Sequence, residues 1–176
     1  MGVAFSRLLQ AVRLDRDAFV WMNFNDRATA DALLFVPLTR FLILLGSGWS
    51  LLGVTTSARG LAVLFNVMVT SVIFWLAYAG LTYAVVRFLF QRGGTYAVYL
   101  RVTGFAYPTL LLVIFTRQLG LSDVAAIFAG SVWFLAVVTR GITYESDLPT
   151  DRAAVSAVLG LVAWVIVASI LNRSLI

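Results

Sequence analysis

The sequence predicts an all-α integral membrane protein, a bundle of five transmembrane helices with an amphipathic N-terminal helix at the membrane surface. Three observations lead to this prediction. Hydrophobic residues make up 61% of the 176 residues, and the mean hydropathy is +0.96. Charged residues make up only 12%, against about 25% in an average soluble domain. Apolar runs close to the roughly 20 residues that cross a bilayer recur along the chain, separated by arginines.

The N-terminal segment, residues 1–30, precedes the first apolar run. Its hydrophobic residues recur at helical spacing, with arginines on the other faces, and they are Phe5, Leu8, Leu9 and Val12. This pattern predicts a helix that lies at the membrane surface. Residues 31–176 are expected to form a single membrane domain, because no linker long enough to separate domains interrupts them.

The first span has two possible positions in the sequence. It covers either residues 33–53, with Arg40 inside, or residues 41–58, with Arg40 at the boundary. Pro37 falls where a helix would begin or bend, since proline lacks the amide hydrogen that a helix interior needs.

The other four spans follow from largely uncharged stretches. They are expected at residues 61–86, 96–116, 124–139 and 153–171. Pro108 predicts a kink in the third span. Ser122 is the expected N-cap of the fourth span, because its hydroxyl can accept a bond from a free amide of the first turn.

Five spans place the two termini on opposite sides of the membrane. With the N-terminus in the cytoplasm, nine arginines belong to the inner segments and three to the outer ones. The excess of arginine in cytoplasmic segments therefore predicts a cytoplasmic N-terminus, with residues 91–96 and 141–151 as inner loops. All thirteen basic residues are arginine, a bias typical of GC-rich prokaryotic genomes, so the expected location is the bacterial cytoplasmic (inner) membrane.

The composition argues against an active site. The chain contains no Cys, no His and no Lys, so thiol nucleophiles, the usual zinc sites and a base for Ser47 in Gly46-Ser47-Gly48 are all missing. Glu145, Asp147 and Asp151 are expected in a solvated loop. We therefore expect no enzyme activity, no bound metal and no cofactor. Nucleic acid is not an expected partner either, because the arginines are dispersed between apolar runs.

Several short stretches occur in a recognisable order. They are Arg13-Leu14-Asp15 followed by Asn25-Asp26-Arg27-Ala28-Thr29-Ala30, then Gly93-Gly94-Thr95-Tyr96 leading to Gly104-Phe105-Ala106-Tyr107-Pro108, and finally Asp151-Arg152-Ala153. In order and spacing they resemble the Yip family, the Ypt/Rab-interacting multispanning membrane proteins, and its bacterial branch in particular. The resemblance implies five spans and a cytoplasmic N-terminus. The family's eukaryotic members bind Rab-type GTPases, but their long cytosolic N-terminal region is not seen here, so the resemblance implies fold more than function.

Nine residues are candidates for contacts with lipid or with a protein partner. They are Arg40, Arg92, Arg101, Arg140, Gly104, Tyr107, Pro108, Ser156 and Gly160. Arg40 is expected near the cytoplasmic end of its span. There it either binds an anionic lipid or partner or, in the favoured interpretation, extends along its own stem to the inner headgroups. Arg101 is expected at a similar level and would form a basic inner rim with Arg92 and Arg140.

Small and aromatic residues suggest how the helices pack. Ser156 and Gly160 form a small-residue stripe with Ala153 and Ala157, which allows close approach of helices within the chain or to a partner. Tryptophans inside the spans are expected to pack or face lipid rather than contact a bound pigment or quinone; they are Trp49, Trp75, Trp133 and Trp164.

These observations favour a non-catalytic membrane scaffold or adaptor that contacts membrane lipids and other membrane proteins through its helix faces. An accessory subunit of a larger respiratory or photosynthetic complex is the first alternative, and co-purifying redox or pigment-binding chains would identify it. A small transporter or channel is the second, and flux into sealed vesicles would identify it.

Overall fold

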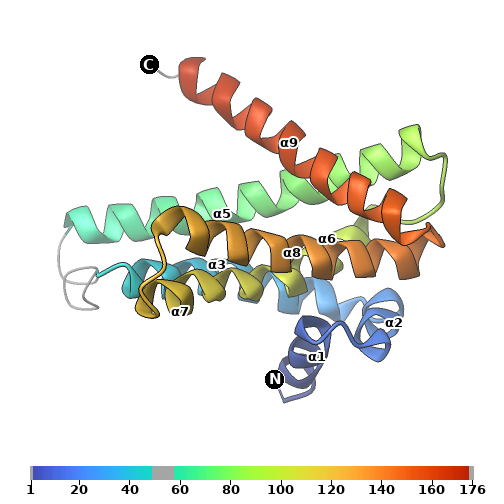
Figure 1. Cartoon of the computed structure of the whole chain (residues 1–176), viewed down its shortest axis with the longest axis horizontal. Helices are drawn as coiled ribbons and strands as arrows, with labels where there is room; N and C mark the ends of the chain where they lie inside the picture. The colour runs from blue at the N-terminus through green and yellow to red at the C-terminus, as the bar shows by residue number, and fades with distance from the viewer. Residues whose placement is uncertain (1, 49–57, 175–176) are drawn as a thin grey trace.

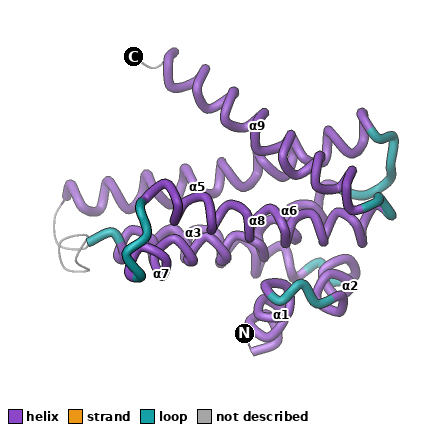
Figure 2. Tube along the Cα trace, viewed as in Figure 1, coloured by secondary structure: helices purple, strands orange, loops and turns teal. Residues whose placement is uncertain are grey.

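The structure, a computed structural model, describes residues 2–48 and 58–174. All regular elements in these two segments are helical (Figures 1 and 2), and no strand occurs among them. Two short helices, α1 (Gly2–Val12) and α2 (Arg16–Phe24), precede the long ones. The predicted all-α class is confirmed.

Five helical spans are long and apolar enough to cross a membrane. The first is α3 (Arg27–Gly46), and the second is α5 (Ala58–Ala84) with a π-helical continuation, η1 (Val85–Leu89). The third comprises α6 (Tyr96–Ala106), the 3-10 segment η2 (Tyr107–Leu111) and α7 (Leu112–Gln118). The fourth and fifth are α8 (Asp123–Ser146) and α9 (Thr150–Ser174). The prediction of an integral membrane protein with five spans is confirmed.

The third span forms the centre of the bundle. Within its most apolar window 61% of the residues are buried, against at most 44% in any other span. It packs against α3, α5 and α8. At Pro108, where a kink is expected, the helix changes to the 3-10 segment η2, because proline cannot donate the amide hydrogen bond of a regular helix. Ser122 caps α8 as predicted, accepting a bond from the Ala125 amide.

Consecutive spans run in opposite directions, so the bundle has two ends. We call one the α2 end, where α3 and α9 begin and where residues 90–95 and 147–149 connect helices. The other is the α7 end, where α3 and α7 finish and α5 and α8 begin. In Figure 1, α9 diverges from the other helices toward its C-terminus.

The amphipathic N-terminal helix is present, but it lies along the flank of the bundle (Figure 1). Leu8 is buried while Phe5 is 59% exposed. The indole nitrogen of Trp133 donates to the Val12 carbonyl at 3.2 Å. Trp133 lies thirteen residues before the end of α8, which is about 20 Å along the helix. The contact therefore places the end of α1 beside the middle of a span.

The predicted limits of two spans are wrong. The first span begins at Arg27 rather than at residue 33 or 41 and continues through Pro37, so the expected domain boundary after residue 30 falls inside it. Its first turns are weakly apolar, but Ala28 and Ala32 are fully buried, and this packing extends the helix. The fourth span continues past Arg140 to Ser146, because Gly141 and Ile142 are buried. The expected inner loop 141–151 is therefore mostly helical.

Candidate functional site

Arg101 is buried at the α2 end, with 5% of its surface exposed. Its guanidinium donates to the hydroxyl of Thr29 at 2.9 Å and to the carbonyls of Met22 at 3.0 Å and Asn23 at 3.2 Å. It also pairs with Asp26, whose side chain is fully exposed. Arg101 thus satisfies the last carbonyls of α2, which have no partner inside that helix, and fastens α2 and α3 to α6.

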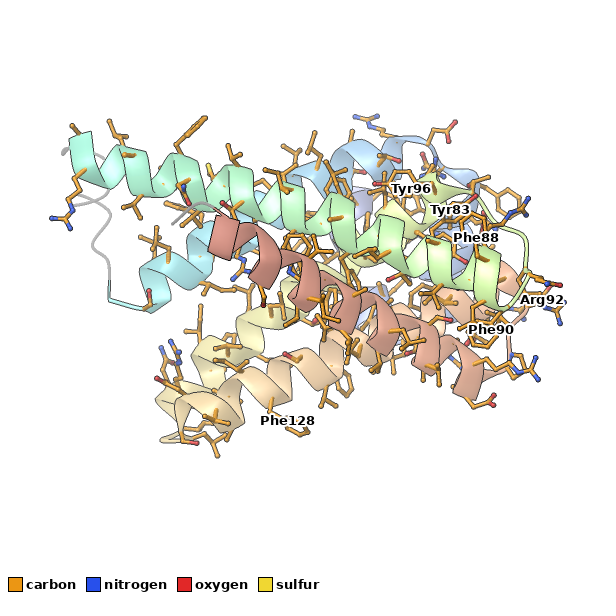
Figure 3. All side chains as sticks on the ribbon, turned by 90° about the horizontal axis from the view of Figure 1, so that it is seen from above. Tyr83, Phe88, Phe90, Arg92, Tyr96 and Phe128 are labelled. Carbon is orange, nitrogen blue, oxygen red and sulfur yellow. The ribbon has the colours of Figure 1, made fainter. Side chains whose placement is uncertain are left out.

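The predicted basic rim of three arginines is therefore wrong for Arg101, which α2 and α3 cover. Arg92 lies exposed between η1 and α6, and Figure 3 shows it at the edge of the molecule. Arg140 is also exposed, and its guanidinium carbon is 5.0 Å from the centre of the Tyr144 ring. Of the three predicted rim residues, Arg92 and Arg140 therefore remain as surface arginines at this end.

Gly104 lies where α6 crosses α3 and α5. A Cβ added there would overlap the side chain of Ala32 and lie 3.2 Å from the indole nitrogen of Trp75. That nitrogen donates to the Leu100 carbonyl at 2.9 Å. The Gly104 backbone is therefore covered by this chain's own helices, while Pro108 contributes to an open apolar hollow against α1.

The small-residue stripe of α9 packs inside the chain. Ser156 and Ala157 are fully buried, and the Tyr78 hydroxyl of α5 donates to the Ala157 carbonyl at 3.1 Å. A Cβ on Gly160 would overlap the hydroxyl of Thr82. Of the two interpretations of this stripe, the structure favours packing within the chain over contact with a partner.

The remaining sequence candidates also have local partners. Ser47 donates to the Leu44 carbonyl at 2.7 Å, within its own helix end. The Trp164 ring meets the Phe74 ring edge-on, with centroids 4.8 Å apart. Glu145 lies on α8 rather than in a loop. Trp49 lies outside the described residues.

Arg40 lies in the second half of α3, six residues before its end at Gly46, so about 9 Å of helix separate it from the α7 end. The prediction that it lies at the level of Arg101 is wrong, because α3 begins earlier than its apolar run. The Arg40 Nε donates to the Tyr107 hydroxyl at 3.2 Å. Tyr107 is itself fully buried, and its ring lies 5.9 Å from the guanidinium carbon.

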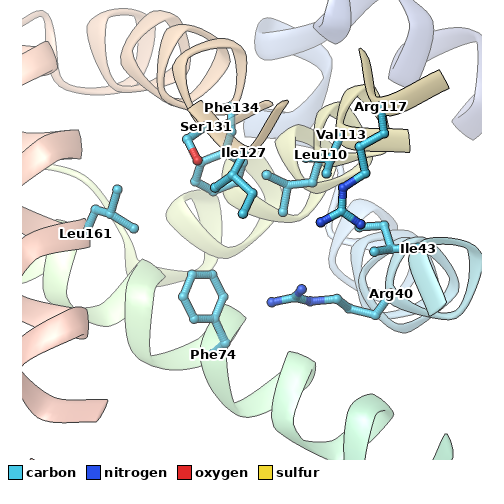
Figure 4. Close-up of a pocket in the computed structure, with 10 residues that line it drawn as sticks. All are labelled: Arg40, Ile43, Phe74, Leu110, Val113, Arg117, Ile127, Ser131, Phe134 and Leu161. Atoms are coloured by element: carbon cyan, nitrogen blue, oxygen red, sulfur yellow. The ribbon is translucent and has the colours of Figure 1, made fainter. Parts of the chain in front are cut away.

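A partly open cavity of about 350 Å³ lies beside Arg40. Figure 4 shows Arg40 and Arg117 extending into it from α3 and α7. The Arg117 Nε is 2.9 Å from a carboxylate oxygen of Asp123, whose side chain is 75% exposed. Apart from Ser131, the other lining residues are apolar: Ile43, Phe74, Leu110, Val113, Ile127, Phe134 and Leu161.

The charges around this cavity do not balance. All eight acidic residues of the chain lie in the described segments, and the two ion pairs found there join Arg101 to Asp26 and Arg117 to Asp123. No carboxylate side chain pairs with Arg40. A guanidinium within an apolar span costs about 2.5–3.5 kcal/mol at the bilayer centre, and such groups commonly mark binding sites. The cavity is therefore suited to an anion.

Sequence reasoning identified Arg40 but missed Arg117, which counted only as an outer charge. Both residues could have been assigned to one end of the bundle, because α3 and α7 finish at the same end. The wrong limits predicted for the first span concealed this. A second feature missed was the exposed polar pair Asn66 and Thr70 on α5.

No group of three or more His, Cys, Asp or Glu side chains that could hold a metal ion occurs within residues 2–48 and 58–174. No family model matches the chain, and the comparisons with curated proteins and with solved structures found no match. The resemblance to the Yip family stays a prediction, and function has to be argued from the geometry.

Proposed function

We propose that this chain is a non-catalytic scaffold or adaptor of the bacterial cytoplasmic membrane, with its N-terminus in the cytoplasm, that binds another membrane protein through the exposed face of α5. The observation that carries the proposal is a polar pair within this apolar face. Thr70 donates to the side-chain oxygen of Asn66 at 3.3 Å, and both residues are exposed. Phe65, Val69 and Ile73 surround the pair and are 69%, 39% and 54% exposed.

The carboxamide of Asn66 has bonding capacity left over. Its NH₂ group carries two donors, and the bond from Thr70, the only one that the described residues make to this side chain, uses its oxygen. Donors without partners cost free energy in lipid. A second helix that presents a carbonyl or hydroxyl to Asn66 would satisfy them, with a gain of about 0.6 kcal/mol per interhelical hydrogen bond.

Three buried hydroxyl groups are held by their own helices, which supports a role without catalysis. Thr39, Ser71 and Ser156 donate to carbonyls of their own helices at 2.7, 2.7 and 2.9 Å. Hydroxyls held in this way are not poised as nucleophiles, and the chain has no His, Cys or Lys to activate one.

Photocrosslinking from two matched positions tests the proposal. Phe65 on α5 and Phe128 on α8 are both 69% exposed, and both lie within eight residues of a helix start at the α7 end. Figure 3 shows Phe128 pointing away from the bundle. Replacing each in turn by p-benzoylphenylalanine in native membranes should give a protein adduct from position 65 and none from position 128.

The substitution Asn66→Leu should weaken the adduct from position 65 while leaving the melting temperature of the purified chain unchanged. Equal protein adducts from both positions, or lipid adducts alone, would contradict the proposal. Stoichiometric capture of redox or pigment-binding chains would replace the adaptor function by that of an accessory subunit.

A further inference from the structure

We propose that the cavity between Arg40 and Arg117 binds the anionic headgroup of a membrane lipid, one lipid per chain. This site is separate from the exposed α5 face, because neither Asn66 nor Thr70 lines it; its walls come from α3, the inward side of α5, the third span, α8 and the first half of α9. Its occupant is a singly charged anionic amphiphile such as phosphatidylglycerol, with its tails in the surrounding bilayer.

The charge at the cavity defines the headgroup. Two guanidiniums face it and one carboxylate, that of Asp123, compensates them, which leaves one positive charge. A guanidinium is a planar fork that binds phosphate or carboxylate oxygens through two parallel hydrogen bonds. A lipid with one negative charge would balance the site, whereas a zwitterionic lipid would leave it positive.

The Arg40 side chain, which pairs with no carboxylate, is also held in place. Its Nε bonds to the Tyr107 hydroxyl, which leaves the terminal nitrogens for a ligand. The Tyr107 ring is fixed in turn by edge-on contacts with Phe74 and Phe134, at centroid distances of 6.0 and 6.3 Å. Arg40 therefore needs little reordering on binding, which keeps the entropic cost low.

The walls define the rest of the ligand. Phe74, Ile127 and Leu161 make the cavity apolar beyond the two arginines (Figure 4). A volume of about 350 Å³ is at the small end of ligand pockets, which measure about 300–1,000 Å³. It suits a headgroup and the first part of a tail. A free hydrated anion would gain nothing from the apolar walls.

Native mass spectrometry of the full chain tests this site. The protein is extracted from bilayers that contain equal amounts of phosphatidylglycerol and phosphatidylcholine, and the retained lipids are counted. We expect one phosphatidylglycerol per chain, and for Arg40→Gln a retention at least about ten-fold lower, since a charge-assisted bidentate contact is lost. Arg59→Gln is the matched control, because Arg59 is exposed at the same end of the bundle and does not line the cavity.

A second variant separates binding from folding. Ser131→Leu adds an apolar side chain to the cavity wall and keeps both arginines, so it should also displace the lipid without lowering the melting temperature. Three results would overturn the proposal: equal retention of the two lipids, equal losses in Arg40→Gln and Arg59→Gln, or displacement of the lipid by millimolar inorganic phosphate, which would indicate a site for free anions.

Discussion

Adding one methyl group to Gly160 tests whether α5 and α9 pack as tightly as the structure indicates. A Cβ at this position would overlap the Thr82 hydroxyl and lie 3.2 Å from the Thr82 Cβ and 3.3 Å from its Cα. The backbone atom cannot rotate away, so Gly160→Ala must push the two helices apart or shift them along each other. Gly80→Ala is the control, because its Cβ would lie 3.7 Å from the Tyr96 ring, an ordinary contact.

The expected difference follows from two opposing terms. Replacing glycine by alanine within a helix stabilises it by about 0.5–1 kcal/mol, and this gain applies at both positions. Overpacking a well-filled contact costs about 1–3 kcal/mol, and only Gly160→Ala bears this cost. Gly160→Ala should therefore be less stable than Gly80→Ala by about 1–3 kcal/mol, with each kcal/mol corresponding to about 2–4 °C in melting temperature for a chain of this size.

Thermal unfolding of the purified chain in mild detergent measures this difference. Thr82→Ala removes the hydroxyl that the new methyl group would meet, so the double variant should recover about 0.5–3 kcal/mol relative to the sum of the single effects. If Gly160→Ala melts at the same temperature as Gly80→Ala and shows no coupling to Thr82, the tight crossing of α5 and α9 is refuted.

Two further predictions concern the α2 end and the orientation of the chain. Arg101→Met should destabilise the chain by about 2–4 kcal/mol, because it leaves the last carbonyls of α2 without partners. Asp26→Asn should change the melting temperature little, because the Asp26 side chain is fully exposed. Similar changes in melting temperature for the two variants would contradict this account. The chain has no native Cys, so a single introduced Cys reports its side of the membrane. In intact cells, the Gly93→Cys thiol at the α2 end should not react with an impermeant maleimide, whereas the Leu121→Cys thiol at the α7 end should. The reverse pattern would place the N-terminus outside the cell.

Hydropathy predicted the number of spans and most of their limits, because long apolar runs leave few alternatives in a membrane. It failed where packing extends a helix beyond its apolar run. The Ala28 and Ala32 side chains add little hydropathy, yet both are fully buried, Ala32 against Gly104. The polar residues Arg27 and Asp31 beside these alanines masked a helix start that the fold requires.

The site was only partly predictable, because its residues lie far apart in the chain. Arg40 stood out as a charge in an apolar run, but its partner Tyr107 lies 67 residues away. Arg117 lies in the last turn of α7, close to the acidic residue Asp123, so in the sequence it resembled an ordinary loop charge. Only the parallel arrangement of α3 and α7, which finish at the same end of the bundle, brings the two guanidiniums to one cavity.

Arg40 and Arg101 show why the role of an arginine within a span cannot be inferred from its position in the sequence. Both interrupt apolar runs, where an arginine without partners is costly. Arg101 recovers it inside the chain, since α2 and α3 supply two carbonyls, a hydroxyl and a carboxylate. Arg40 receives only the hydroxyl and ring of Tyr107 from the described residues. Neither group carries a full negative charge, so no anion among the described residues balances Arg40, and under the lipid proposal the surrounding bilayer supplies it.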